Sequence, residues 1–160
     1  MNKPCHLVVD VQVLMTASGI TDPPDDGSGV DLLNAMRDCP CGRLVWDSEG
    51  LIRSQYEQKL NETTFAREWL GNLLLEGKLV AVDRATLTKA QRIAIMETGL
   101  VGEDLQWYVR TAAKSPENCL VSHDSDYDNS TRQALKKQLD IKVRSAGEGS
   151  VMVKRRSAAR

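Results

Sequence analysis

The stretch CHLVVDVQVL, residues 5–14, decides the fold class that this chain is expected to adopt. Apolar residues follow one another there with a single acidic residue, Asp10, among them. Such a nearly continuous apolar run is typical of a strand in a parallel sheet that is covered on both faces. The pattern returns in four shorter runs, at residues 43–46, 79–82, 119–122 and 141–143.

The segments between these runs carry apolar residues at spacings of three and four, which indicates helices. Ser48 and Thr88 are the expected N-caps of two of them. Strands that alternate with helices predict an α/β fold, a three-layer sandwich in which helices flank a mainly parallel central sheet of about five strands. The helices are expected within residues 48–60, 65–76, 88–96, 105–115 and 129–139.

The length of 160 residues and the mass of 17.7 kDa fit one compact domain. We expect that domain over residues 1–145, followed by a basic, flexible tail over residues 146–160. The turn-forming stretch SGITDPPDDGSG, residues 18–29, is expected to be a loop. The net charge is −1, with an excess of acidic residues in the body of the chain and an excess of basic residues at its C-terminal end.

Composition also limits the class of protein. No run approaches the roughly 20 apolar residues of a membrane-spanning helix, and the first residues lack the layout of a secretion signal. We therefore expect a cytoplasmic protein that binds no membrane. The four cysteines indicate reduced thiols rather than a disulfide scaffold. The spacing of Cys39 and Cys41 also differs from that of a zinc knuckle.

Acidic residues occur at the ends of two expected strands. Asp10 interrupts the first strand, while Asp124 and Asp126 follow the strand at 119–122. Ligands of open α/β sheets bind beyond the carboxyl ends of the strands. No lysine or arginine lies within four residues of Asp10, so a divalent cation is the natural counter-charge for a buried carboxylate there. The alternative is a solvated acidic turn in residues 123–128, because Asp-Ser-Asp is ordinary loop chemistry.

Three segments of the chain resemble PIN-domain ribonucleases. HLVVDVQVLM, residues 6–15, is similar to the opening strand of that family, and CLVSHDSDY, residues 119–127, is similar to a later strand and turn. EDLQWYVRTAA, residues 103–113, resembles the helix that precedes the later strand. The three segments occur in the order of the family, and the resemblance extends from about residue 5 to residue 143.

The resemblance implies a metal-dependent endoribonuclease. Asp10, Asp104 and Asp124 would be its catalytic, metal-coordinating acids, with Asp126 as an additional metal ligand. The implied cofactor is Mg²⁺ or Mn²⁺, which lowers the pKa of a bound water so that it attacks a phosphodiester of single-stranded or structured RNA.

One position departs from the family pattern. Where the family usually has a glutamate, the similar segment LIRSQYEQKL, residues 51–60, has Gln55. The amide ligates a metal only through its carbonyl oxygen, so Glu57, about 200° further around the helix, and Glu49 are the other candidates for the missing acid. The departure leaves open a second interpretation, a catalytically weakened PIN-like module that binds RNA or a protein partner.

The implied partner is RNA, and basic residues should surround the acidic site. A solvated helix face is the alternative for each of the five candidates, Arg53, Arg110, Lys154, Arg155 and Arg156. The resemblance also implies a protein antitoxin, if the enzyme is a toxin, and a homodimer. A third interpretation is an α/β phosphatase or a response-regulator-like domain, which needs a lysine at a later strand end. Lys142 lies within its expected strand, so this interpretation ranks last.

Overall fold

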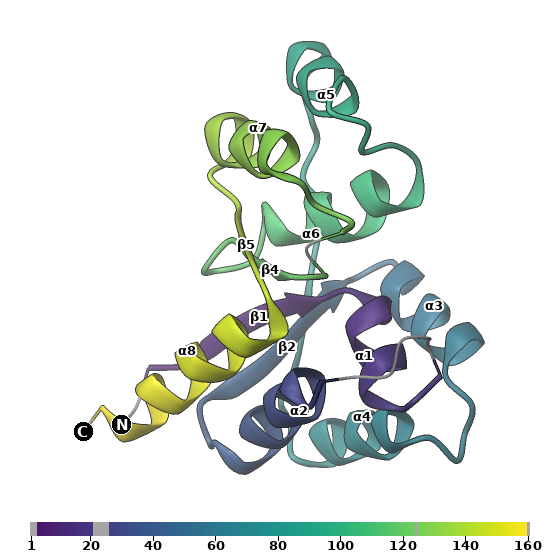
Figure 1. The fold of residues 1–160 in the computed structure, drawn as a ribbon, viewed down its shortest axis with the longest axis vertical. Coiled ribbons are helices and arrows are strands. Elements are labelled where there is room, and N and C mark those ends of the chain that lie inside the picture. Colours follow the sequence, from purple (N-terminus) through teal and green to yellow (C-terminus); the bar gives the residue numbers. More distant parts are fainter. Residues whose placement is uncertain (1–2, 21–25, 124, 160) are drawn as a thin grey trace.

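A parallel sheet forms the centre of the molecule (Figure 1). The computed structural model describes residues 3–20, 26–123 and 125–159. Its strands are β1 (Cys5–Val9), β2 (Gly42–Asp47), β3 (Leu79–Val82), β4 (Cys119–Val121) and β5 (Lys142–Arg144). They lie in the order β3-β2-β1-β4-β5, and each neighbouring pair is parallel. The predicted α/β fold is confirmed, and this sheet is parallel throughout.

Helices cover both faces of the sheet and complete a three-layer sandwich. Figure 1 shows α1, α2, α4 and α8 on one side of the sheet and α5, α6 and α7 on the other. The helices are α1 (Val11–Ala17), α2 (Ser28–Asp38), α3 (Leu51–Lys59), α4 (Phe65–Leu75), α5 (Lys89–Met96), the π-helix η1 (Leu105–Val109), α6 (Arg110–Ala112), α7 (Asn129–Leu139) and α8 (Ala146–Ala158). No helix in the described ranges has both the length and the apolar character needed to cross a membrane.

The first strand is shorter than its sequence pattern predicts. β1 ends at Val9, and the rest of the predicted strand belongs to helix α1. Asp10 ends the strand because its carboxylate accepts a hydrogen bond from the backbone N–H of Gln12, so that it caps the helix. This change of direction places Asp10 at the carboxyl edge of the central strand.

The C-terminal segment is a packed helix, so the prediction of a flexible tail over 146–160 is wrong for residues 146–158. Ser145 and Glu148 form a capping box at the start of α8, and Val153 is fully buried. A Cβ on Gly149 would lie 3.2 Å from side-chain atoms of Leu32 and Val121. Glycine therefore allows α8 to approach α2 and the sheet closely.

Two further sequence predictions differ from the structure. The expected loop over 18–29 lies partly outside the described residues, and its last two residues already belong to α2. Ser48 is not the cap of α3, because the carboxylate of Asp47 accepts from the N–H groups of Leu51 and Ile52 instead. The predicted cap at Thr88 is confirmed by a capping box at the start of α5.

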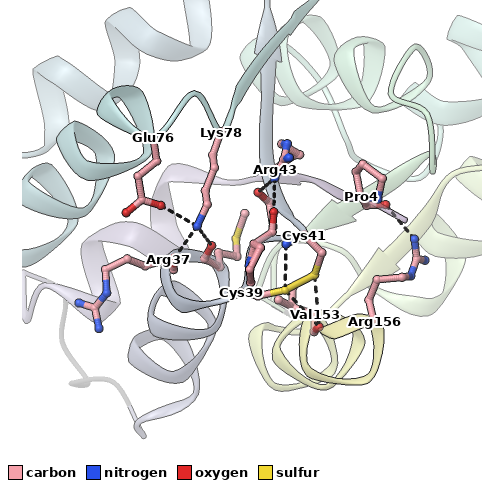
Figure 2. The surroundings of a disulfide bond; sticks show 12 residues. Pro4, Arg37, Cys39, Cys41, Arg43, Glu76, Lys78, Val153 and Arg156 are labelled. Atoms are coloured by element: carbon pink, nitrogen blue, oxygen red, sulfur yellow. Dashed lines mark hydrogen bonds and ion pairs between the residues drawn. A yellow bond between two sulfur atoms is a disulfide. The ribbon is translucent and has the colours of Figure 1, made fainter. Parts of the chain in front are cut away.

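A disulfide joins Cys39 and Cys41 in the turn between α2 and β2 (Figure 2). The turn brings their Cα atoms to 5.2 Å, within the range that a disulfide requires. Both sulfur atoms lie beneath the carbonyl of Val153 in α8, at 3.9 and 3.7 Å. The prediction of reduced thiols is thus wrong for this pair. It is confirmed for Cys5 and Cys119, where burial raises the thiol pKa to about 11 and about 12.

Candidate active site

Asp10 is a buried carboxylate at the carboxyl edge of the sheet, and only 2% of its surface is exposed. The hydroxyl of Ser122, which follows β4, donates to Asp10 Oδ2 at 2.9 Å. Burial raises the pKa of Asp10 to about 6, although the hydrogen bond from Gln12 opposes this shift. The negative charges of Asp104 and Asp126 raise the pKa of Asp10 further.

Two of the other predicted acids converge on Asp10. Asp104 immediately precedes the π-helix η1, a form of helix that often occurs at functional sites. Its half-buried position raises the pKa of Asp104, and the charges of Asp126 and Glu103 add to the shift. Asp126 Oδ2 lies 3.4 Å from the Ser122 hydroxyl. The structure therefore brings Asp10, Asp104 and Asp126 together, whereas Asp124 lies outside the described residues.

A tyrosine hydroxyl lies among these acids. Tyr127 is 1% exposed, and its hydroxyl has no hydrogen-bond partner in the described part of the chain. Burial raises the pKa of Tyr127 well above its usual value, and the charges of Asp10, Asp104 and Asp126 raise it further. A buried hydroxyl without a partner is costly, and this one can donate to a group that enters the site.

Two other tyrosines brace the junction of β1 and α1. The Tyr56 hydroxyl donates to the carbonyl of Val9. The Tyr108 hydroxyl accepts from the N–H of Val11 at 3.2 Å and donates to Oε1 of Gln55. Gln55 therefore belongs to a buried chain of neutral hydrogen bonds that holds the backbone of Val11, while Tyr56 separately holds that of Val9.

The other candidates for the missing glutamate are both paired with arginines. Glu57 pairs with Arg53 at 3.0 Å on the exposed face of α3, and Glu49 pairs with Arg84 at 2.8 Å. That Glu57 supplies an additional ligand stays a prediction, and such a role would require Glu57 to leave Arg53.

The acid cluster, which comprises Asp10, Asp104 and Asp126, consists of oxygen donors. The neighbouring charges that act most strongly on Asp10 and Asp104 are all negative. Mg²⁺ and Mn²⁺ prefer such oxygen donors, and Mg²⁺ commonly takes one or two carboxylates and several waters. Within residues 3–20, 26–123 and 125–159, no group of three or more His, Cys, Asp or Glu side chains lies so that it could hold a metal ion. The donor type of the three acids suits a hard cation, whereas the described side chains do not form a complete ligand set.

The predicted RNA-binding residues divide between the two edges of the sheet. Arg110 lies on α6 just beyond η1, and Arg53 on α3 lies over the ring of Trp46 at 5.7 Å. Arg156 bonds the carbonyl of Pro4 at 2.8 Å, at the amino end of β1 (Figures 1 and 2). The prediction that Lys154, Arg155 and Arg156 surround the acids is therefore wrong, because α8 carries them to the opposite edge.

A histidine and two hydroxyl residues occupy the surroundings of the acids. Nε2 of His123 lies 2.9 Å from the hydroxyl of Thr16, which donates to the carbonyl of Gln12. Ser122 is a hydrogen-bond partner of Asp10. The sequence did not single out Tyr56, Tyr108 or Tyr127 for the site, because a tyrosine among apolar residues is typical of the hydrophobic core.

Comparisons with protein-family models, with curated proteins and with solved structures found no match to this chain. The site is therefore interpreted from its own geometry and from the motif resemblance.

Proposed function

We propose that this chain is a metal-dependent endoribonuclease of the PIN type that hydrolyses phosphodiester bonds in RNA. One observation carries the proposal: at the carboxyl edge of the central strands the negative charges of Asp104 and Asp126 act on Asp10, the charge of Asp126 also acts on Asp104, and no cationic side chain is among the strongest neighbours of Asp10 or Asp104. Like charges at short range repel strongly in a partly buried site, so a bound cation would relieve the cluster.

The side chains have distinct roles in this proposal. Asp10 and Asp104 would hold Mg²⁺ or Mn²⁺, together with Asp124 and Asp126. When bound, the ion would supply a water of lowered pKa for attack on the phosphorus. Ser122 orients the Asp10 carboxylate through its 2.9 Å hydrogen bond. The buried hydroxyl of Tyr127 is available to donate to an oxygen of the phosphate or of a water.

The surrounding framework holds these groups in place before substrate arrives. Tyr56 and Tyr108 fix the backbone of Val9 and Val11 on either side of Asp10. A rigid scaffold of this kind lowers the cost of orienting the reacting groups. In this proposal Gln55 supports Tyr108 and is not a ligand of the ion.

A second function is favoured by the same glutamine. Gln55 is neutral and already bonded to Tyr108, so the position where the family usually has an acid adds no charge to the site. A catalytically weakened module that binds RNA or a protein partner would have this feature. We also propose a homodimer, a cytoplasmic location and, if the enzyme is a toxin, a protein antitoxin. The family resemblance implies the homodimer and the antitoxin.

A cleavage assay separates the two functions. Single-stranded RNA is incubated with the protein in Mn²⁺ or Mg²⁺, with and without a chelator. We expect cleavage that the chelator abolishes and that Asp10→Asn lowers by at least about 100-fold, since even partners of metal ligands cost 10–100-fold when removed. Asp38→Asn, an exposed acid at the other edge that pairs with Arg37, is the matched control. Cleavage that persists unchanged in Asp10→Asn removes the proposed site, and binding of RNA without cleavage supports the module.

A further inference from the structure

Three arginines gather on elements that follow β3. Arg84 lies in the loop after β3, Arg92 lies on α5 and Arg110 lies on α6. Arg110 Nε donates to the carbonyl of Ala85 at 2.6 Å, and its Nη1 donates to Oε1 of Gln106 at 2.5 Å. Arg84 Nη1 donates to the carbonyl of the same Gln106 at 3.2 Å. Gln106 thereby holds two of the guanidinium groups close to each other.

The positive charges of this cluster exceed its negative charges. Burial lowers the pKa of Arg110, the neighbouring charges of Arg84 and Arg92 lower it further, and only Glu49 among the strongest neighbours opposes them. Glu49 is already paired with Arg84 at 2.8 Å. Three guanidinium groups thus share one carboxylate, and such an arrangement is relieved by an anion.

Donor groups remain available in the cluster. Arg92 is exposed, and its side chain makes no hydrogen bond or ion pair with the residues that the structure describes. Arg84 Nε is buried without a partner within the same residues. A cavity of about 150 Å³ opens between these elements, lined by Thr86, Leu87, Arg92, Leu105, Gln106 and Arg110. The feature is therefore a hollow with guanidinium donors in its wall.

The hollow adjoins the acid cluster through one helix. Leu105 in its wall directly follows Asp104, and Arg110 lies six residues beyond Asp104. Across the sheet, β3 is two strands from β1, a distance of about 10 Å at the usual strand spacing. A strand of nucleic acid that crosses the acids can therefore reach the arginines with a neighbouring phosphate.

We propose that Arg92 and Arg110 bind a phosphate of the RNA strand next to the bond that is cleaved, and that Gln106 positions Arg110. This subsite rests on the proposed ribonuclease function. A guanidinium group matches the geometry of phosphate oxygens with paired N–H donors, whereas an ammonium group acts as a point charge. The subsite contributes affinity and register along the strand and takes no part in the bond-breaking step.

The direct test measures RNA binding without catalysis. A fluorescently labelled single-stranded RNA is titrated with the protein in the presence of a chelator, at several salt concentrations. We expect Arg92→Ala to weaken binding about 5–10-fold and to reduce the slope of log K against log salt by about 0.7, the value for one phosphate contact on a single strand. Arg92→Lys keeps the charge and should recover part of the affinity. Arg92 is exposed, so its replacement leaves the fold intact.

A matched control removes the same charge from the opposite edge. Arg155→Ala on α8 is also exposed, and we expect it to change the affinity less than about twofold. Equal affinities for Arg92→Ala and the unmodified protein, or equal losses for Arg92→Ala and Arg155→Ala, overturn the subsite.

A second probe separates failure of the subsite from failure of the proposed function. Inorganic phosphate should raise the Tm of the protein and raise that of Arg92→Ala less. Stabilisation by phosphate without any RNA binding supports the anion site and overturns its assignment to RNA, together with the ribonuclease proposal. RNA that is cleaved and bound equally well by Arg92→Ala overturns the subsite and leaves the ribonuclease proposal standing. Absence of both effects overturns both proposals.

Discussion

Buried charged side chains at the two edges of the sheet have different neighbours. At the amino edge, Lys78 precedes β3 and is 6% exposed. Its ammonium group pairs with Glu76 at 2.7 Å and donates to the carbonyls of Met36 and Arg37 (Figure 2). At the carboxyl edge, Asp10 is even more buried, yet its nearest charges are other acids.

The difference teaches that burial alone does not mark a functional site. Lys78 is compensated on all sides, so its charge supports the fold. Asp47 is as buried as Asp10 at the same edge, but two N–H groups at the start of α3 satisfy its carboxylate. Asp10 likewise accepts two hydrogen bonds, so what distinguishes it is the negative charge of the two neighbouring acids. A buried carboxylate among other acids is a candidate for function.

The largest change in stability is expected at the compensated edge. Lys78→Met removes the ammonium group and leaves two buried carbonyls and Glu76 without their donor. We expect the free energy of unfolding to fall by about 2–3 kcal/mol, as measured by urea unfolding. Lys136→Met at the exposed pair with Asp140 is the control and should change it by less than about 0.5 kcal/mol. Equal effects of the two variants would remove the contrast between the edges.

In the presence of a chelator, we expect Asp10→Asn to increase the free energy of unfolding instead of lowering it. The pKa of Asp10 is raised from 3.8 to about 6 by folding, so the native state binds this proton more tightly than the unfolded chain. Its contribution to stability is therefore fully present below about pH 4 and is lost as the pH rises through about 6. The asparagine variant does not titrate and should be more stable at pH 7, by on the order of 2 kcal/mol.

Urea unfolding at a series of pH values checks this sign. The stability gap between the asparagine variant and the original protein should be small near pH 4 and should widen up to about pH 6. A gap that is independent of pH, or a variant that is less stable at pH 7, contradicts the picture of an uncompensated carboxylate.

We expect a smaller difference in the free energy of unfolding between Tyr→Phe variants at two buried tyrosines. The hydroxyl of Tyr56 donates to Val9, so Tyr56→Phe should lower the free energy of unfolding by about 1 kcal/mol. The hydroxyl of Tyr127 has no partner among the described residues, so Tyr127→Phe should leave stability unchanged or raise it slightly. Tyr127→Phe should nevertheless slow RNA cleavage. Destabilisation by Tyr127→Phe to the same degree as Tyr56→Phe would show that its hydroxyl is a structural donor.

The sequence predicted the sheet well because its signals are local. The run at Leu79–Val82 coincides with β3, and the acids at Asp10, Asp104 and Asp126 do converge. The boundary after Val9 could not be predicted, because a continuous apolar run satisfies both the strand period and the helix period. Only the capping bond from Gln12 to Asp10 decides between them.

Features that depend on residues far apart in the chain could not be predicted from the sequence. The Gly- and Ser-rich composition of 146–150 resembles a flexible segment, but small residues there allow α8 to pack on Leu32 of α2. The acidic surroundings of the Tyr127 hydroxyl depend on the placement of Asp10 and Asp104, which lie far away in the chain. Long-range packing decides both, and neither has a local pattern.

Titration with Mn²⁺ followed by Tm tests the central claim most directly, because a ligand that binds only the native state stabilises it. The account predicts that the Tm of the unmodified protein rises with Mn²⁺ and that the Tm of Asp10→Asn, already higher without metal, stays constant. A rise of equal size in both proteins, or no rise in the unmodified protein, would contradict the claim that the carboxyl edge binds a cation.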